Sequence, residues 1–68
     1  MYTINQAKTI VAKHLNKLGV KADLIYSTID MTKDECILET ANLIEYKKGE
    51  FPLEEIKLFV YMPEHLFI

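Results

Sequence analysis

The sequence has no tryptophan, no arginine and a single cysteine, Cys36, among its 68 residues. A lone cysteine cannot form an internal disulfide, and no cluster of cysteines and histidines is present that could hold a structural metal. The two supports that commonly stabilise very small proteins are therefore excluded, and self-association is the support that remains. The absence of arginine beside eight lysines is typical of AT-rich genomes, so we expect a bacterium of low GC content, or one of its phages, as the source.

Long apolar runs and catalytic motifs are also absent. No uninterrupted apolar stretch approaches the roughly 20 residues of a membrane-spanning helix, and the amino-terminal residues lack the pattern of a secretory signal. We therefore expect a cytoplasmic protein without a membrane span. Glycine-rich phosphate-binding patterns are missing, and the residues around Ser27 and Cys36 do not suggest an activated nucleophile. We expect no enzymatic activity, no catalytic residue, no cofactor and no metal.

The composition is that of a chain that folds. Half of the residues are hydrophobic and 26% are charged, which is far from the composition of disordered proteins. A chain of this length hides only about 60% of its unfolded surface when it folds, so its core is small. We predict one globular domain over residues 1–68.

The clearest predicted element is a helix that begins after Thr3. Thr3 and Gln6 fit the capping box, in which each residue satisfies a backbone amide at the start of a helix. Gly19 is expected to end this helix, and Val20 to pack back against its last turn. The apolar residues of this helix recur at helical spacing: Ile4, Ala7, Val11, Leu15 and Leu18. His14 lies beside this stripe, and we expect it at the edge of the core.

A second helix is predicted after Thr32. Thr32 and Glu35 form another capping box, and the helix should end at Tyr46, before two lysines and Gly49. Its apolar stripe consists of Cys36, Ile37, Thr40, Leu43 and Ile44. The position of Cys36 in this stripe predicts a buried and unreactive thiol.

The other two segments are ambiguous. Residues 21–31 have a helical apolar pattern, which we favour, but their β-branched and aromatic residues also suit a strand. Pro52 followed by two glutamates predicts a helix start, whereas residues 58–62 are apolar on every face. We predict a mainly α fold, a compact bundle of three to four short helices. The alternative is an α+β fold with residues 24–29 and 58–62 as strands.

Charge is distributed unevenly along the chain. Residues 1–22 contain four lysines and no acid, and residues 23–68 contain ten acids and four lysines. Lys13, Lys17 and Lys21 fall on one flank of the first helix if its turns are projected past its end. The favoured interpretation is a solvated face partly neutralised by the acids of this chain, and the functional one is a face for an anionic partner. The candidate face consists of Lys8, Lys13, Lys17 and Lys21.

Nucleic-acid binding through this face is the alternative function. A glycine-containing turn after the first helix shares features with a helix-turn-helix, but Leu15 stands where a close helix crossing needs a small residue. The second helix of such a motif would carry Asp23 and Asp30 and no arginine, so it would repel phosphates. The net charge of −2 also disfavours DNA or RNA as the partner.

The carboxyl-terminal segment is the strongest candidate for an interface, since eight of its last eleven residues are apolar or aromatic. A chain this short can hardly bury them all, and an exposed apolar patch is typical of an interaction site. We therefore expect a small non-enzymatic protein-interaction or regulatory accessory module that forms a homodimer and binds an unidentified protein. The candidate interface residues are Leu58, Phe59, Tyr61, Met62, Leu66, Phe67 and Ile68.

Overall fold

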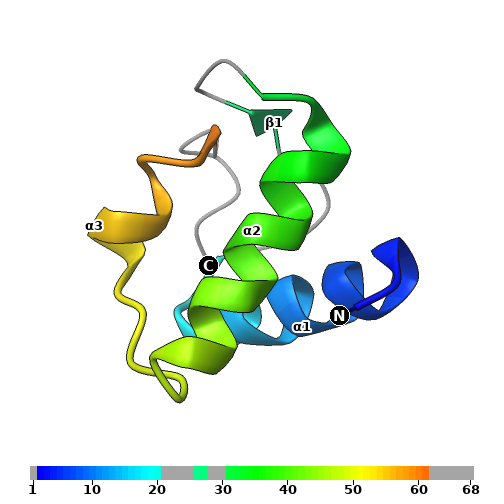
Figure 1. Cartoon of the computed structure of the whole chain (residues 1–68). Coiled ribbons are helices and arrows are strands. Elements are labelled where there is room, and N and C mark those ends of the chain that lie inside the picture. The colour runs from blue at the N-terminus through cyan, green and yellow to red at the C-terminus, as the bar shows by residue number, and fades with distance from the viewer. Residues whose placement is uncertain (1, 21–25, 28–30, 62–68) are drawn as a thin grey trace.

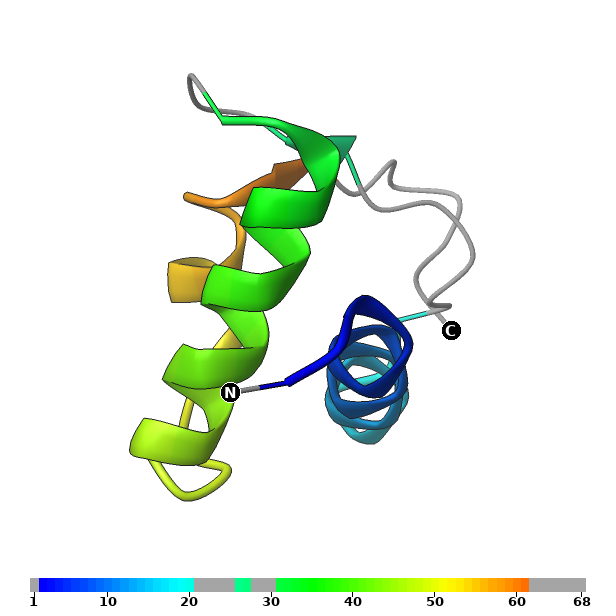
Figure 2. The same cartoon turned by 45° about the vertical axis from the view of Figure 1, so that its right-hand side comes forward.

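The structure is a computed structural model that describes residues 2–20, 26–27 and 31–61. Its elements are α1 (Ile4–Lys17), β1 (Tyr26–Ser27), α2 (Lys33–Tyr46), α3 (Leu53–Ile56) and β2 (Val60–Tyr61) (Figure 1). The two long helices pack against each other at a steep angle, so that α1 is seen nearly end-on in Figure 2 while α2 runs through the view. The short α3 lies beside α2 in both views. The predicted small, mainly helical bundle is confirmed, with three helices in the part of the chain that is described.

Both ends of α1 are as the sequence predicts. Thr3 Oγ1 accepts a hydrogen bond from the Gln6 amide at 3.2 Å, and Gln6 Oε1 accepts one from the Thr3 amide at 3.0 Å. At the other end, Gly19 has a φ of 83°, and the Val20 amide donates to the Leu15 carbonyl at 2.9 Å. This is the Schellman arrangement, and Val20 is fully buried against the core.

The bounds of α2 are also confirmed. The Glu35 amide donates to Thr32 Oγ1 at 3.1 Å, and Glu35 Oε1 accepts from the Thr32 amide at 3.4 Å. The helix ends at Tyr46, and the Gly49 amide donates to the Ile44 carbonyl at 3.0 Å. In this second Schellman turn the left-handed position is occupied by Lys48, with a φ of 52°, where α1 has a glycine.

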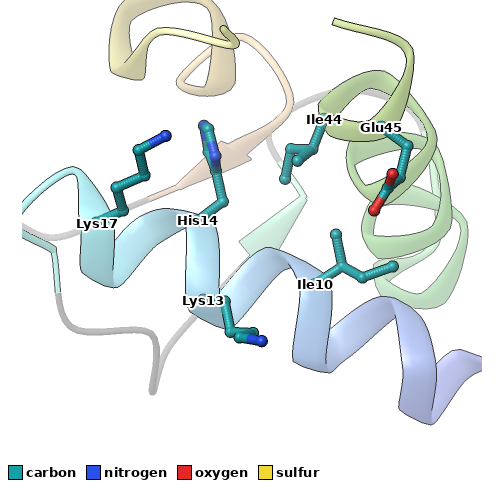
Figure 3. Close-up of a pocket in the computed structure, with 6 residues that line it drawn as sticks. All are labelled: Ile10, Lys13, His14, Lys17, Ile44 and Glu45. Carbon is teal, nitrogen blue, oxygen red and sulfur yellow. The ribbon is translucent and has the colours of Figure 1, made fainter. Parts of the chain in front are cut away.

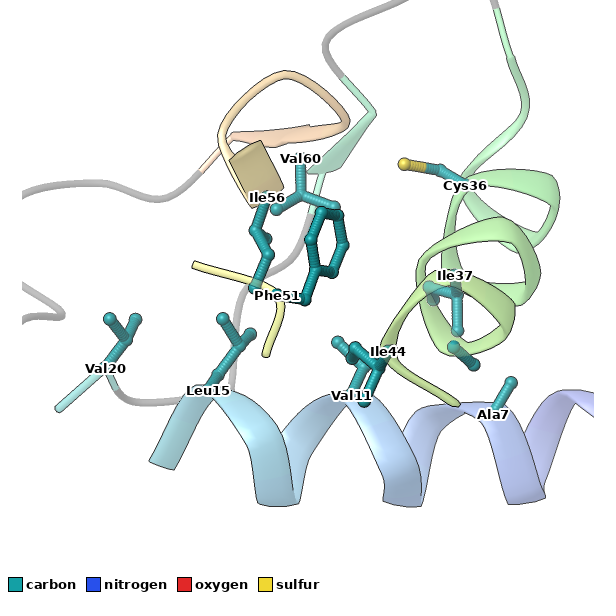
Figure 4. Close-up of a cluster of buried hydrophobic side chains, with 11 residues drawn as sticks. Ala7, Val11, Leu15, Val20, Cys36, Ile37, Ile44, Phe51, Ile56 and Val60 are labelled. Atoms are coloured by element: carbon teal, nitrogen blue, oxygen red, sulfur yellow. The ribbon is translucent and has the colours of Figure 1, made fainter. Parts of the chain in front are cut away.

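The core is formed where α1 meets α2 and the chain after α2. Ala7, Val11 and Leu15, each four residues apart, form a fully buried stripe of α1 and point toward the other elements in Figure 4. This spacing places them on one face of the helix, as predicted. The remaining buried apolar residues are Val20, Cys36, Ile37, Ala41, Ile44, Phe51, Ile56 and Val60.

One predicted element is wrong. Tyr26 and Ser27 form a short strand that pairs antiparallel with Val60 and Tyr61, with Tyr26 opposite Tyr61. The helix predicted over residues 21–31 therefore fails at Tyr26 and Ser27, and also at Met31, which lies in a bend before α2. The alternative with strands is right at the four paired positions, whereas Leu58 and Phe59, predicted as part of the same strand, lie in a turn. The pattern of nearby residues could not reveal a pairing partner so far along the chain. The rest of this helix prediction, at residues 21–25 and 28–30, and the strand prediction at residue 62 lie outside the described residues.

The helix start predicted at Pro52 is confirmed, but the helix is a single turn. Pro52 is the N-cap of α3, which ends at Ile56. The apolar run after it divides between two environments, because Val60 is 1% exposed and Tyr61 is 54% exposed. This alternation is that of a strand with one buried face. Within residues 2–20, 26–27 and 31–61, no helix has the length and apolar character needed to cross a membrane.

Candidate functional site

A depression of about 400 Å³ lies between α1 and the carboxyl-terminal half of α2 (Figure 3). We call it the α1–α2 groove. His14 and Ile44 are buried, Ile10 is half-buried, and the three charged members are exposed. The groove therefore has an apolar interior and a charged rim. Its lining residues are Ile10, Lys13, His14, Lys17, Ile44 and Glu45.

Helical spacing explains why α1 contributes four of these side chains. Ile10, Lys13, His14 and Lys17 follow the pattern i, i+3, i+4, i+7, so they share one face of the helix. This face adjoins the buried stripe of α1 that holds the two long helices together. The packing of α2 then brings Ile44 and the following glutamate to the opposite side of the groove.

His14 is the most constrained residue of the groove. Its side chain is 5% exposed, and its Nε2 atom lies 2.6 Å from the carbonyl oxygen of Phe51. A carbonyl oxygen only accepts hydrogen bonds, so Nε2 carries the proton and donates. The ring also stacks on that of Phe51, with centroids 6.5 Å apart and planes inclined by 28°. The prediction of a histidine at the core edge is confirmed, and it forms one rigid wall of the groove.

Two of the four lysines in the predicted face for an anionic partner line the groove. Lys8, Lys13 and Lys17 are all exposed, and no ion pair within 4.0 Å engages any of them in the described part of the chain. Lys13 and Lys17 line the groove, but Lys8 lies about 140° around the helix from Lys13 and does not. Lys21 lies outside the described residues.

The two groove lysines have different surroundings. A Cβ atom placed on Gly49 would be 3.6 Å from Lys17 Nζ, so this ammonium group lies at the carboxyl-terminal end of α2. A cation is favoured there because helix carbonyls give that end a partial negative charge. Lys13 points outward in Figure 3, and its exposed side chain can reach a bound group by changing rotamer.

The predicted apolar interface is described only in part. Leu58 is 65% exposed and Tyr61 is 54% exposed, whereas Phe59 is half-buried and its ring lies 6.1 Å from that of Phe51, edge to face. Met62, Leu66, Phe67 and Ile68 lie outside the described residues. Sequence reasoning did not single out the exposure of Tyr46, at 82%, although it is expected for a residue on the flank of α2 opposite its apolar stripe.

Cys36 is buried, as predicted. It is 1% exposed, its Sγ donates to the Phe59 carbonyl, and its own carbonyl accepts a hydrogen bond from Thr40 Oγ1 at 2.7 Å. The contact of Cys36 with Phe59 connects α2 to the segment before β2. Among residues whose placement is described, no three His, Cys, Asp or Glu side chains gather at a point that could hold a metal ion.

A comparison of the chain with protein-family models, curated proteins and solved structures finds no match.

Proposed function

We propose that this chain is a small protein-interaction module that self-associates through its apolar carboxyl-terminal segment. The observation that carries the proposal is the exposure of Leu58 and Tyr61, at 65% and 54%, on either side of the buried Val60. Burial of a large apolar side chain is favourable by roughly 1.5 to 3 kcal/mol of free energy. Binding of a partner that covers both Leu58 and Tyr61 is therefore favoured.

The occupant that best fits this surface is a second copy of the chain. In a twofold dimer both subunits contribute the same surface to the interface. Leu58 and Tyr61 of each subunit therefore supply four exposed apolar side chains in total. Phe59 lies between them in sequence and packs on Phe51, so the backbone that carries them is anchored to the core. Within the described residues, the only other large apolar side chain of comparable exposure is Tyr46 on α2.

Sedimentation tests this proposal. The wild-type protein should be a dimer that dissociates on dilution, since mass action makes a self-associating protein depend on its own concentration. The Leu58→Lys/Tyr61→Lys variant should be monomeric at every concentration, because the lysines of two subunits would meet across the twofold interface and repel each other. Tyr46→Lys is the matched control and should dimerise like the wild type. A wild-type protein that is strictly monomeric at the highest concentration would refute the proposal.

Nucleic-acid binding is the second candidate, and the favouring observation is that α1 carries exposed lysines and no acid. Binding of this kind releases counterions from phosphates, so its affinity falls steeply as salt rises, whereas an apolar protein interface is much less sensitive. Titration of a labelled oligonucleotide at rising salt distinguishes the two. The presence of Glu45 in the groove beside the lysines argues for the protein partner.

A further inference from the structure

We propose that the α1–α2 groove is a docking site for an acidic segment of a partner protein. In this site one apolar side chain of the partner enters between Ile10 and Ile44, and two carboxylates one helical turn apart meet Lys13 and Lys17. Neither Leu58 nor Tyr61 lines the groove, so this site shares no residue with the described part of the proposed dimer surface.

The charges of the groove favour an anionic segment. Lys13 and Lys17 are four residues apart on one helix, a spacing at which the two Cβ atoms lie about 5 to 6 Å apart. Two acidic residues with the same spacing on a partner helix would meet both lysines once Lys13 changes rotamer. Helix α1 contains no acid of its own, and neither lysine has an ion-pair partner within the described chain. The attraction is therefore available to a ligand.

The shape of the groove favours a side chain from another protein surface over a small molecule. Its volume of about 400 Å³ is at the lower end of the usual range of ligand pockets. However, Lys13, Lys17 and Glu45 are exposed, so the groove is open and would leave much of a small ligand in water. An open groove with an apolar interior suits the projecting side chain of a docked helix.

The walls of the groove are held in place before a partner binds. His14 is fixed by its hydrogen bond to the Phe51 carbonyl, and Ile44 is 6% exposed in the core. A site that is already ordered loses little conformational freedom on binding, which favours affinity.

Glu45 determines the orientation in which an acidic segment can bind in this groove. Its carboxylate lines the groove opposite the lysines of α1, so it repels an acidic residue that approaches from the side of α2. A partner segment is therefore expected to place its acids toward α1 and a neutral or basic residue toward Glu45. The same carboxylate disfavours a phosphate backbone, which presents negative charge along its whole length.

The test uses a capped, alanine-based helical peptide with two glutamates four residues apart and one leucine between them on the same face. Binding is monitored in two-dimensional NMR spectra of the full chain. The chemical shifts of Ile10, Ile44 and Glu45 should change when the peptide binds. The Lys13→Gln/Lys17→Gln variant should bind about tenfold more weakly, because each exposed ion pair contributes a modest amount. The control Lys8→Gln removes a lysine of the same helix outside the groove and should bind within about twofold of the wild type.

Two control peptides separate charge from apolar contact. Replacement of the glutamates by glutamine, or of the leucine by alanine, should each weaken binding, and Glu45→Gln should strengthen it. Equal binding of the glutamate and glutamine peptides, or an unchanged affinity of the Lys13→Gln/Lys17→Gln variant, would overturn the proposal. Binding of an oligonucleotide without binding of the acidic peptide would overturn it in favour of a nucleic-acid site. The Leu58→Lys/Tyr61→Lys variant should retain peptide binding. The proposal of a dimer and the proposal of a docking groove can therefore be refuted independently.

Discussion

His14 Nε2 donates a hydrogen bond to the carbonyl oxygen of Phe51 across a distance of 2.6 Å. The two residues are 37 positions apart in the sequence, so this bond joins α1 to the segment between α2 and α3. Such a bond explains how a polar ring can be 5% exposed, because a buried polar group is costly only when it lacks a partner.

Replacement of His14 by phenylalanine should destabilise the protein by about 1 to 3 kcal/mol. The new ring can still stack on Phe51, but it leaves the carbonyl without the donor that His14 supplies. Urea unfolding followed by circular dichroism should show a lower midpoint with an unchanged slope. Asn16→Ala, an exposed position on the same helix, is the control and should change stability by no more than about 0.5 kcal/mol. A His14→Phe variant as stable as this control would contradict the role of the bond.

The same contact predicts the tautomer of His14. Because the Phe51 carbonyl can only accept, the neutral ring should carry its proton on Nε2 and leave Nδ1 unprotonated. Long-range proton–nitrogen correlation spectra distinguish the two ring nitrogens. A proton on Nδ1 of the neutral ring would show that the bond is not formed in solution.

Removing the glycine at the end of α1 and adding one at the end of α2 should change the stability of the protein in opposite directions. Gly19→Ala should destabilise the protein by about 1 to 2 kcal/mol, because its φ of 83° is unfavourable for a residue with a Cβ atom. No atom lies within 4 Å of a Cβ built there, so the cost is conformational and not a clash.

Lys48→Gly should stabilise the protein by about 0.5 kcal/mol, since Lys48 occupies the equivalent left-handed position with a φ of 52°. Thermal unfolding of both variants and of the wild type measures the change in melting temperature that each substitution causes. Shifts of the same sign would contradict the equivalence of the two turns.

Cys36 should react with a thiol reagent at neutral pH far more slowly in the native protein than in urea, by about tenfold or more. The reason is its burial at 1% exposure and the contact of its Sγ with the Phe59 carbonyl. The control is the same protein unfolded in urea, where the thiol is accessible. Rapid labelling of the native protein would show that the segment before β2 opens readily.

The groove could be anticipated only on one side. The spacing of Ile10, Lys13, His14 and Lys17 on one helical face can be read from the sequence. The charge pattern predicts Lys13 and Lys17 as part of a basic face, but it does not single out Ile10. Ile44 and Glu45 were not part of that prediction, because their approach to α1 depends on how the two helices cross. A helical pattern defines which face is apolar, but it does not define which residues of another element will meet it.

Local sequence determined where the two long helices of this protein begin and end. The capping boxes of Thr3 and Thr32 and the turn at Gly19 involve residues only a few positions apart, so their hydrogen bonds need no partner from another part of the chain. Tertiary structure alone decided the pairing of Tyr26 and Ser27 with β2 and the bond from His14 to Phe51. These contacts join residues more than thirty positions apart, and such contacts form only when packing of the whole core offsets the entropy of closing the intervening chain.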